Sequence, residues 1–145
     1  MVALQMLIFT ADVTLPPALT EGGEGGLWLL ISLFVCHYLA DYCLTTPAMI
    51  RAKTDGRTLA PIMAHAAVHA VLMGCCLWVF GTDFTRSALL AGVELLSHFV
   101  IDTAKGRITA RFPLLADNKQ KPFWMLNGFD QLLHILVIIG IWYAA

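Results

Sequence analysis

Four long apolar segments constrain this sequence more than any other feature. They are, in chain order, residues 27–46, 59–80, 86–104 and 127–145. Each has about the 17–25 residues that a helix needs to cross a bilayer. Composition agrees, because 59% of the residues are hydrophobic and only 13% are charged, whereas soluble domains have about 25% charged residues. The sequence therefore predicts an all-α membrane protein, a bundle of four transmembrane helices in one domain of residues 27–145.

Prolines and glycines mark the expected ends of these segments. Pro47 follows the first segment, and Pro61 falls in the first turn of the second, where proline is tolerated. Gly106 is placed to cap the third helix at its C-terminus. Residues 1–26, with two prolines and four glycines in their second half, predict an extended or interfacial lead-in on the non-cytoplasmic side. They have no basic n-region, so a cleaved signal peptide is not expected.

The basic residues predict the orientation of the bundle. Eight of the nine lysines and arginines lie in two alternate connections: Arg51, Lys53, Arg57, Lys105, Arg107, Arg111, Lys119 and Lys121. The positive-inside rule places both connections in the cytoplasm and both termini outside. We therefore expect a multi-pass protein of a bacterial inner (cytoplasmic) membrane. Residues 107–126 mix apolar and basic side chains, which favours a short interfacial segment or a plain connecting loop between helices three and four.

Every histidine lies in an apolar segment, four residues from an aspartate or from another histidine. The pairs are His37/Asp41, His65/His69, His98/Asp102 and Asp130/His134. A spacing of four places both members on one helix face, about 6 Å apart along the axis. Ionisable groups inside a bilayer are energetically unfavourable and are usually kept for function. Facing helices of a bundle build metal sites from such side chains.

Alternating helix directions place all four pairs in the cytoplasmic half of the bundle, at similar depth. The members nearer the cytoplasm are Asp41, His65, Asp102 and Asp130, and the deeper ones are His37, His69, His98 and His134. Keeping a carboxylate ionised costs less free energy near water than deep in the bundle, so this order is the favourable one. Glu94, one helical turn before His98, extends this stripe. It could orient His98, bind a metal, relay protons, or remain protonated and hydrogen-bonded.

This donor set suits a divalent first-row ion such as Zn, Mn or Fe. The eight paired side chains exceed the four ligands of one tetrahedral zinc. Either two ions bind about 3.5–4 Å apart, or one ion binds and the remaining groups orient its ligands and exchange protons. Clustered carboxylates repel one another in a low dielectric, and a divalent cation offsets this. A metal-free polar network between helices is the alternative.

Four stretches together resemble a family of small bacterial membrane proteins, the domain of unknown function 3307. They are HYLADYCLTTPAMIRAK (37–53), HAAVH (65–69), SHFVIDTAKGR (97–107) and FDQLLH (129–134). The resemblance covers about residues 30–138 and implies a helical membrane bundle without a firm activity. Thr45 stands where the family has a glutamine, whereas Lys53 and Lys105 match positions that tend to be lysine. A looser similarity of pattern connects the chain to membrane-bound proteins assigned as metal-dependent hydrolases.

These observations favour an enzyme that uses a bound metal to hydrolyse an ester or phosphoester at the cytoplasmic membrane face. The candidate catalytic residues are Asp41, His65, Asp102 and Asp130, and all eight paired side chains are candidate ligands. Glu94 and Lys105 are expected behind this layer, where Lys105 and Arg107 could hold an anionic head group. A serine nucleophile elbow and a phosphate-binding glycine loop are both absent from the sequence, which disfavours acyl-enzyme and P-loop chemistry.

Three other functions stay open. Chains of carboxylates and histidines also conduct metal ions or protons in transporters, facing histidines can ligate haem, and a polar network can set helix register in a non-catalytic membrane subunit. The net charge of −1 argues against a nucleic-acid partner. The expected partners are membrane lipid and a small-molecule or lipid substrate, and an oligomer is compatible with the sequence.

Overall fold

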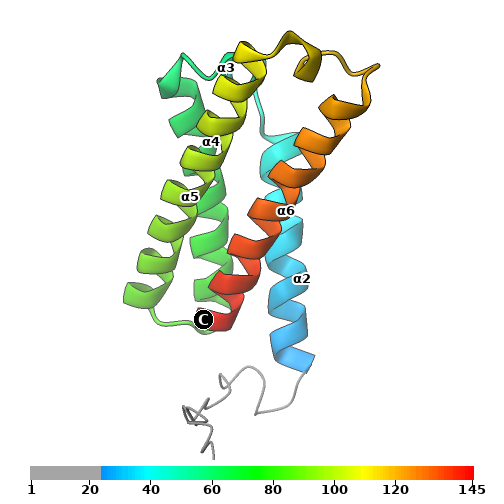
Figure 1. Ribbon diagram of the computed structural model, residues 1–145. Helices are drawn as coiled ribbons and strands as arrows, with labels where there is room; N and C mark the ends of the chain where they lie inside the picture. The colour runs from blue at the N-terminus through cyan, green and yellow to red at the C-terminus, as the bar shows by residue number, and fades with distance from the viewer. Residues whose placement is uncertain (1–23) are drawn as a thin grey trace, which may run out of the picture.

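The computed structural model describes residues 24–145, and every regular element in this part of the chain is helical. The elements are α2 (Glu24–Tyr38), the π-helix η1 (Leu39–Cys43), α3 (Pro47–Asp55), α4 (Leu59–Val79), α5 (Phe84–Arg111), the 3₁₀ turn η2 (Pro113–Leu115) and α6 (Lys121–Ala144). The predicted lead-in lies outside the described residues up to residue 23, and α2 already begins at Glu24. Four long helices run side by side, with α3 at one end and the C-terminus at the other (Figure 1).

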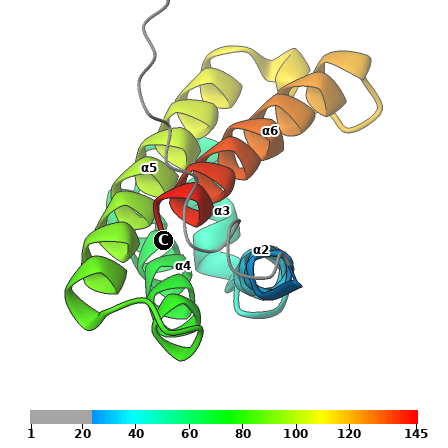
Figure 2. The same cartoon turned by 90° about the horizontal axis from the view of Figure 1, so that it is seen from below.

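Four helices are long and apolar enough to cross a membrane, which confirms the predicted all-α bundle with four candidate spans. They are α2 continued by η1, α4, α5 and α6. They form a ring in which α4 packs on α5, α5 on α6, α6 on α2 and α2 on α4 (Figure 2). Large apolar side chains such as Trp28, Val71 and Leu89 are exposed on the outside of this ring. Outward apolar and inward polar side chains are the arrangement expected of helices that face lipid.

Two predicted helix ends were wrong. Gly106 does not cap the third helix but lies inside α5, which continues to Arg111. The helix ends there because Phe112 precedes Pro113, and a residue before proline is disfavoured in the α conformation. The fourth helix begins at Lys121 rather than near Asn127, with a proline in its first turn. The segment predicted between helices three and four is therefore short, and its centre is the 3₁₀ turn η2.

The connection between the first two spans contains a helix that the sequence analysis did not predict. Thr46 caps α3 by accepting a hydrogen bond from the Met49 N–H at 3.3 Å, and Pro47 occupies the first turn, where its missing N–H is not needed. Gly56 ends the helix in the left-handed conformation, with φ of 59°, which glycine adopts without steric strain. α3 packs against α4 and α5.

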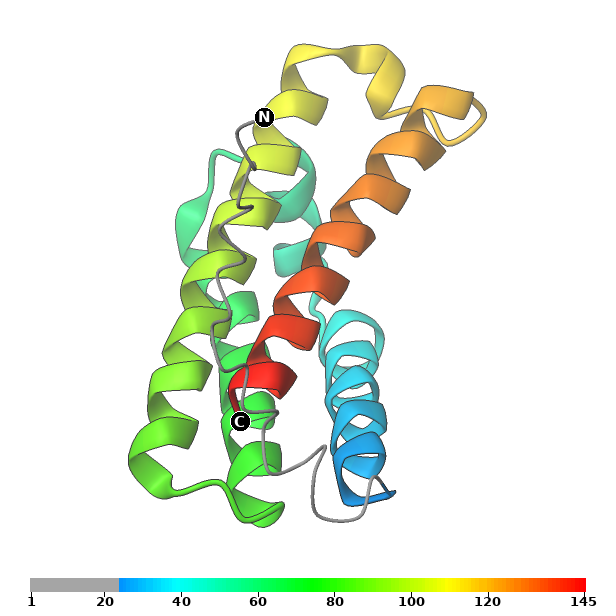
Figure 3. The same ribbon diagram turned by 60° about the horizontal axis from the view of Figure 1, so that its bottom comes forward.

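The interior of the bundle is divided into an apolar and a polar end. The apolar core at the end away from α3 consists of Leu29, Leu33, Met73, Leu77, Ile138 and Ile141. There the Trp142 indole N–H donates to the Gly26 carbonyl at 2.7 Å and joins α6 to α2. At the other end, α6 runs obliquely across the bundle and its first turns stand away from α5 (Figure 3). The interior at that end is occupied by ionisable side chains.

Candidate metal centre

Nine ionisable side chains from four helices meet in the polar end of the bundle. They are His37, Asp41, His65, His69, Glu94, His98, Asp102, Asp130 and His134. None of these side chains is more than 8% exposed. All eight paired residues, together with Glu94, are therefore brought into one cluster, as the spacing and the alternating helix directions indicated. This spatial relationship turns four separate motifs into one candidate site.

His98 lies at the centre of the cluster. Its ring centroid is 3.7 Å from that of His69 and 4.1 Å from that of His134. The rings of His65 and His37 follow at 5.1 and 5.8 Å. On its deeper side, Glu94 Oε1 lies 3.2 Å from His98 Nδ1. A proton on Nδ1 would be donated to this carboxylate and would leave Nε2 as an acceptor, so the geometry agrees with an orienting role for Glu94.

Three overlapping groups of side chains within residues 24–145 could each hold one metal ion. They are His37/His69/Glu94/His98, Asp41/His65/His69/His98 and His98/Asp102/His134, and the ligand atoms of each group lie within 4.8 Å of one another. His98 belongs to all three, so the groups cannot be filled independently. Which group binds an ion depends on which donor atoms are already engaged with other protein groups.

The group His98/Asp102/His134 has the donor atoms best placed for an ion. His98 Nε2, Asp102 Oδ1 and His134 Nε2 are buried and lack a hydrogen-bond partner within the described part of the chain, although buried polar atoms nearly always have one. Asp102 Oδ2 is 3.5 Å from His98 Nε2, and Asp102 Oδ1 is 3.6 Å from His134 Nε2. Two ligands of one tetrahedral ion, each about 2.0–2.2 Å from it, lie about 3.3–3.6 Å apart. Both the spacing and the unpaired lone pairs therefore fit a metal.

Lys53 enters the cluster from α3, a contact that the sequence analysis missed. Its Nζ lies 3.0 Å from Asp41 Oδ1, 3.0 Å from His65 Nε2 and 3.2 Å from Asp102 Oδ2. Burial acts to lower the pKa of the Lys53 ammonium, but the carboxylates of Asp102 and Asp41 outweigh it and raise the pKa above its ordinary value. Lys53 is therefore a fixed positive charge in the site. The sequence holds one hint of this contact, because Lys53 matches a position that tends to be lysine in the resembled family.

A contact between two glycines places Lys53 in the cluster. A Cβ built on Gly106 would come within 2.7 Å of the Gly56 Cα and of the Lys53 carbonyl oxygen. Only glycines permit such close packing of two backbones. The end of α3 is thus held directly on the backbone of α5, and Lys53, one turn earlier in α3, points inward.

Asp41 is held by two further polar groups that the sequence analysis did not identify. It lies in η1, and π-helical turns are rare and often occur at functional sites. The Thr45 hydroxyl lies 2.8 Å from the Asp41 carbonyl oxygen and 2.9 Å from that of Ala40, so it satisfies the end of this turn. The Gln131 side-chain amide donates to Asp41 Oδ2 at 3.2 Å. Gln131 therefore restricts the direction of the Asp41 carboxylate, and Thr45 holds the backbone that carries it.

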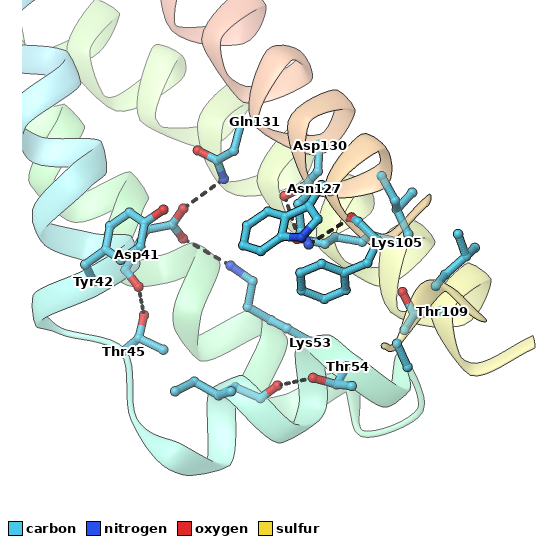
Figure 4. A pocket seen from close by; sticks show the side chains of 16 residues that line it. Asp41, Tyr42, Thr45, Lys53, Thr54, Lys105, Thr109, Asn127, Asp130 and Gln131 are labelled. Carbon is cyan, nitrogen blue, oxygen red and sulfur yellow. Dashed lines mark hydrogen bonds and ion pairs between the residues drawn. The ribbon is translucent and has the colours of Figure 1, made fainter. Parts of the chain in front are cut away.

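A cavity of about 500 Å³ adjoins the cluster, between α3, α5 and the start of α6. Asp41, Lys53, Lys105 and Asp130 supply its polar lining, and its apolar lining includes Tyr42, Ile50, Leu115, Phe123 and Trp124. In Figure 4, Lys53 extends from α3 toward Asp41, and Lys105 extends toward Asp130, which its Nζ contacts at 2.8 Å. Among the described residues, Arg107 does not line this cavity. The cavity offers an amphiphilic ligand access to the cluster.

The fold and the site define a class: a helical bundle with four candidate membrane spans and a buried cluster of histidines and acids that could bind metal. Within that class, the chain belongs to the family described as protein of unknown function (DUF3307), whose model matches residues 29–145. This match confirms the family resemblance. No curated protein and no solved structure matches the chain. The looser similarity to metal-dependent hydrolases stays a prediction.

Proposed function

We propose that this protein is a metal-dependent hydrolase of an ester or phosphoester, acting at the cytoplasmic face of a bacterial inner membrane. The observation that carries the proposal is the trio of buried, unpartnered donor atoms on His98, Asp102 and His134, close beside a cavity with a mixed polar and apolar lining. Zn, Mn or Fe suits the combination of imidazole and carboxylate. Such an ion lowers the pKa of a water toward neutrality and polarises an ester oxygen.

His98, Asp102 and His134 would hold the ion, and His37 could complete the set. Both ring nitrogens of His37 are buried without a hydrogen-bond partner in the described segments. Its ring centroid is 5.4 Å from that of His134, so the His37 ring lies beside the group, and a change of its side-chain rotamer would bring a nitrogen to the ion. His69 and Glu94 would then support His98 from behind.

Asp130 is the best-placed general base among the four candidate catalytic residues. It lines the cavity, and its Oδ1 is 3.7 Å from His134 Nε2. Lys105 engages the other oxygen, Oδ2, whereas Oδ1 is buried and lacks a hydrogen-bond partner in residues 24–145. A carboxylate oxygen placed between a metal ligand and the cavity can accept a proton from an attacking water. Asp41 and His65 are instead engaged by Lys53.

The two lysines support a substrate that carries negative charge. Lys53 and Lys105 both line the cavity. Lys105, which contacts Asp130 alone, keeps donors for the oxygen of a phosphoester or the charge that develops on a carboxylic ester, and Lys53 adds positive charge beside it. The aromatic wall formed by Phe123 and Trp124 would accommodate an apolar portion of the same molecule. We therefore favour an amphiphilic ester that reaches the site from the membrane surface.

Transport through the bundle is supported less well. The next layer beyond Glu94 in the described structure is the apolar core, whose members Leu33, Leu77 and Ile138 are fully buried. An ion path through that layer would have to pass these apolar side chains, which is unfavourable for a charge. Haem binding is also disfavoured, because the imidazole rings around His98 pack too closely to admit a macrocycle.

Hydrolysis assays on detergent-purified protein test the proposal. Chromogenic carboxylic esters, phosphomonoesters and phosphodiesters should reveal one hydrolysed class, with turnover lost on chelation and restored by Zn, Mn or Fe. Asp130→Asn should abolish turnover but retain metal. The control Leu96→Ala, at a 63% exposed position on α5, should retain both. Metal flux into liposomes without turnover would support a transporter, and absence of both metal and turnover would support a structural polar network.

A further inference from the structure

We infer that Lys53 occupies the position of a second cation, so that the centre takes one metal ion and not two. The inference rests on the proposed metal centre and decides a question that the donor count leaves open. Eight candidate ligands are enough for two ions. The contacts of Lys53 divide these ligands into two sets. The first, His98, Asp102 and His134, can bind an ion, and the second, around Asp41 and His65, is already neutralised by the ammonium.

The donor atoms of the second set are bound to the ammonium. An ammonium group donates three hydrogen bonds and accepts none, and the Lys53 Nζ has three neighbours at 3.0–3.2 Å: Asp41 Oδ1, His65 Nε2 and Asp102 Oδ2. Where the ammonium donates to His65 Nε2, it uses the single lone pair of that nitrogen, and where Nε2 instead carries a proton, that proton is directed to Asp41 Oδ1 at 3.1 Å; in both cases Nε2 has no lone pair left. The same lone pair would have to bind an ion in the group Asp41/His65/His69/His98. Lys53 and a metal ion are therefore mutually exclusive there.

The remaining set is untouched by Lys53. Asp102 contacts Lys53 only through Oδ2, and its Oδ1 faces His134 Nε2. The Asp102 carboxylate thus lies between two cation positions: Oδ2 forms an ion pair with the ammonium and is 3.5 Å from His98 Nε2, and Oδ1 lies toward His134 Nε2. This division is the geometry of a bridging carboxylate in a two-metal site, with a lysine in place of one ion.

The charge of the cluster supports the same stoichiometry. Asp41, Glu94, Asp102 and Asp130 supply four carboxylates, and Lys53 and Lys105 supply two ammonium groups. With all of these groups ionised, two negative charges remain, which one divalent ion neutralises. A second divalent ion would leave the buried site with two positive charges, and uncompensated charge in a low dielectric is strongly unfavourable.

The position of Lys53 is set by the backbone and not by its flexible side chain alone. Gly56 rests on Gly106, and the Lys53 carbonyl is part of the same contact. The ammonium therefore cannot withdraw far unless α3 leaves α5. A tethered lysine of this kind competes with a free ion at a very high effective concentration.

Metal stoichiometry tests the inference. The full-length protein in detergent is saturated with Zn²⁺, desalted and analysed for zinc per chain. Wild type should retain one zinc, and Lys53→Arg, which keeps the charge, should also retain one. Lys53→Met should retain two, because Asp41, His65 and His69 are then free for a second ion while His98 stays on the first. The control Lys105→Met removes a lysine that pairs with Asp130 alone and should retain one.

The zinc counts distinguish an error in the role of Lys53 from an error in the metal centre itself. Two zinc ions in wild type, or one in folded Lys53→Met, would overturn the role of Lys53 and leave the metal centre standing. No zinc in wild type would instead overturn the proposed metal centre itself, and with it this inference. If Lys53→Met does not fold, the wild-type titration still decides, because saturation at two ions contradicts the inference without any variant.

Discussion

Gly106 of α5 supports Gly56 at the end of α3 so closely that a Cβ on Gly106 would lie 2.7 Å from the Gly56 Cα. The neighbours are backbone atoms that cannot rotate away. We predict that Gly106→Ala destabilises the protein by about 1–3 kcal/mol, the usual range for overpacking, and displaces Lys53 from the cluster. Thermal unfolding in detergent measures the effect.

Gly92 provides the matched control for this substitution. It lies in the same helix, and a Cβ there would meet nothing within 4 Å. Gly92→Ala should leave stability unchanged or raise it by up to about 1 kcal/mol, because alanine loses less backbone entropy in a helix. Equal destabilisation by both substitutions would contradict a specific contact between α3 and α5.

Substitution of the favoured ligands should lower metal content and thermal stability together. Asp102→Ala and His134→Ala each remove one of the three unpartnered donors. Binding to the native state alone stabilises a protein by about 4 kcal/mol when the free metal is a thousandfold above Kd, and the variants should lose that increment. Chelation should lower the melting temperature of wild type but hardly change that of either variant. Unchanged zinc content in both variants would refute the assignment of these ligands.

The ion pairs of Lys53 should stabilise the metal-free protein over a wide pH range. Its pKa is raised in the folded state, since Asp102 and Asp41 outweigh the effect of burial. A raised pKa stabilises the folded state fully below the unfolded value, about 10.4, and the effect is lost only as pH rises through the higher folded value.

In the presence of a chelator, Lys53→Met should therefore lower the free energy of unfolding by about 3 kcal/mol. This is the lower end of the range for breaking a buried ion pair, because the Lys53 side chain is 18% exposed. The difference from wild type should be constant between about pH 7 and 9. Urea titrations at several pH values measure it. A difference that disappears within this interval would show that Lys53 loses its charge there.

The positive-inside rule predicts that the α3 end faces the cytoplasm. Two of the eight basic residues at that end, Lys53 and Lys105, point into the site, but the other six still outnumber Arg86 at the opposite end. Alkaline phosphatase fused after Ala145 should be active in bacterial cells, and a fusion after Arg57 should be inactive. The reverse pattern would place the cavity on the outer face.

Helix periodicity was sufficient to predict how the site assembles. His37 and Asp41 share a helix face, as do His98 and Asp102, and alternating helix directions bring such pairs to one level. Local spacing determines a helix face, so these features can be inferred before any tertiary contact is known.

The role of Lys53 could not be inferred in the same way. A lysine between two spans is ordinarily a signal of topology, and its entry into the cluster depends on the packing of Gly56 on Gly106, two residues far apart in the sequence. For the same reason the sequence alone predicts a helix end at Gly106, which lies inside α5. Sequence also could not show which of eight candidate ligands share an ion, because that depends on which atoms other groups already engage.

X-ray absorption at the zinc edge of loaded, desalted wild-type protein reads out the metal centre around His98. We expect retained zinc with nitrogen and oxygen neighbours at about 2.0–2.2 Å and the outer scattering of imidazole rings, both lost in His98→Ala. Zinc that washes out of wild type, or a shell of oxygen without imidazole, would contradict it.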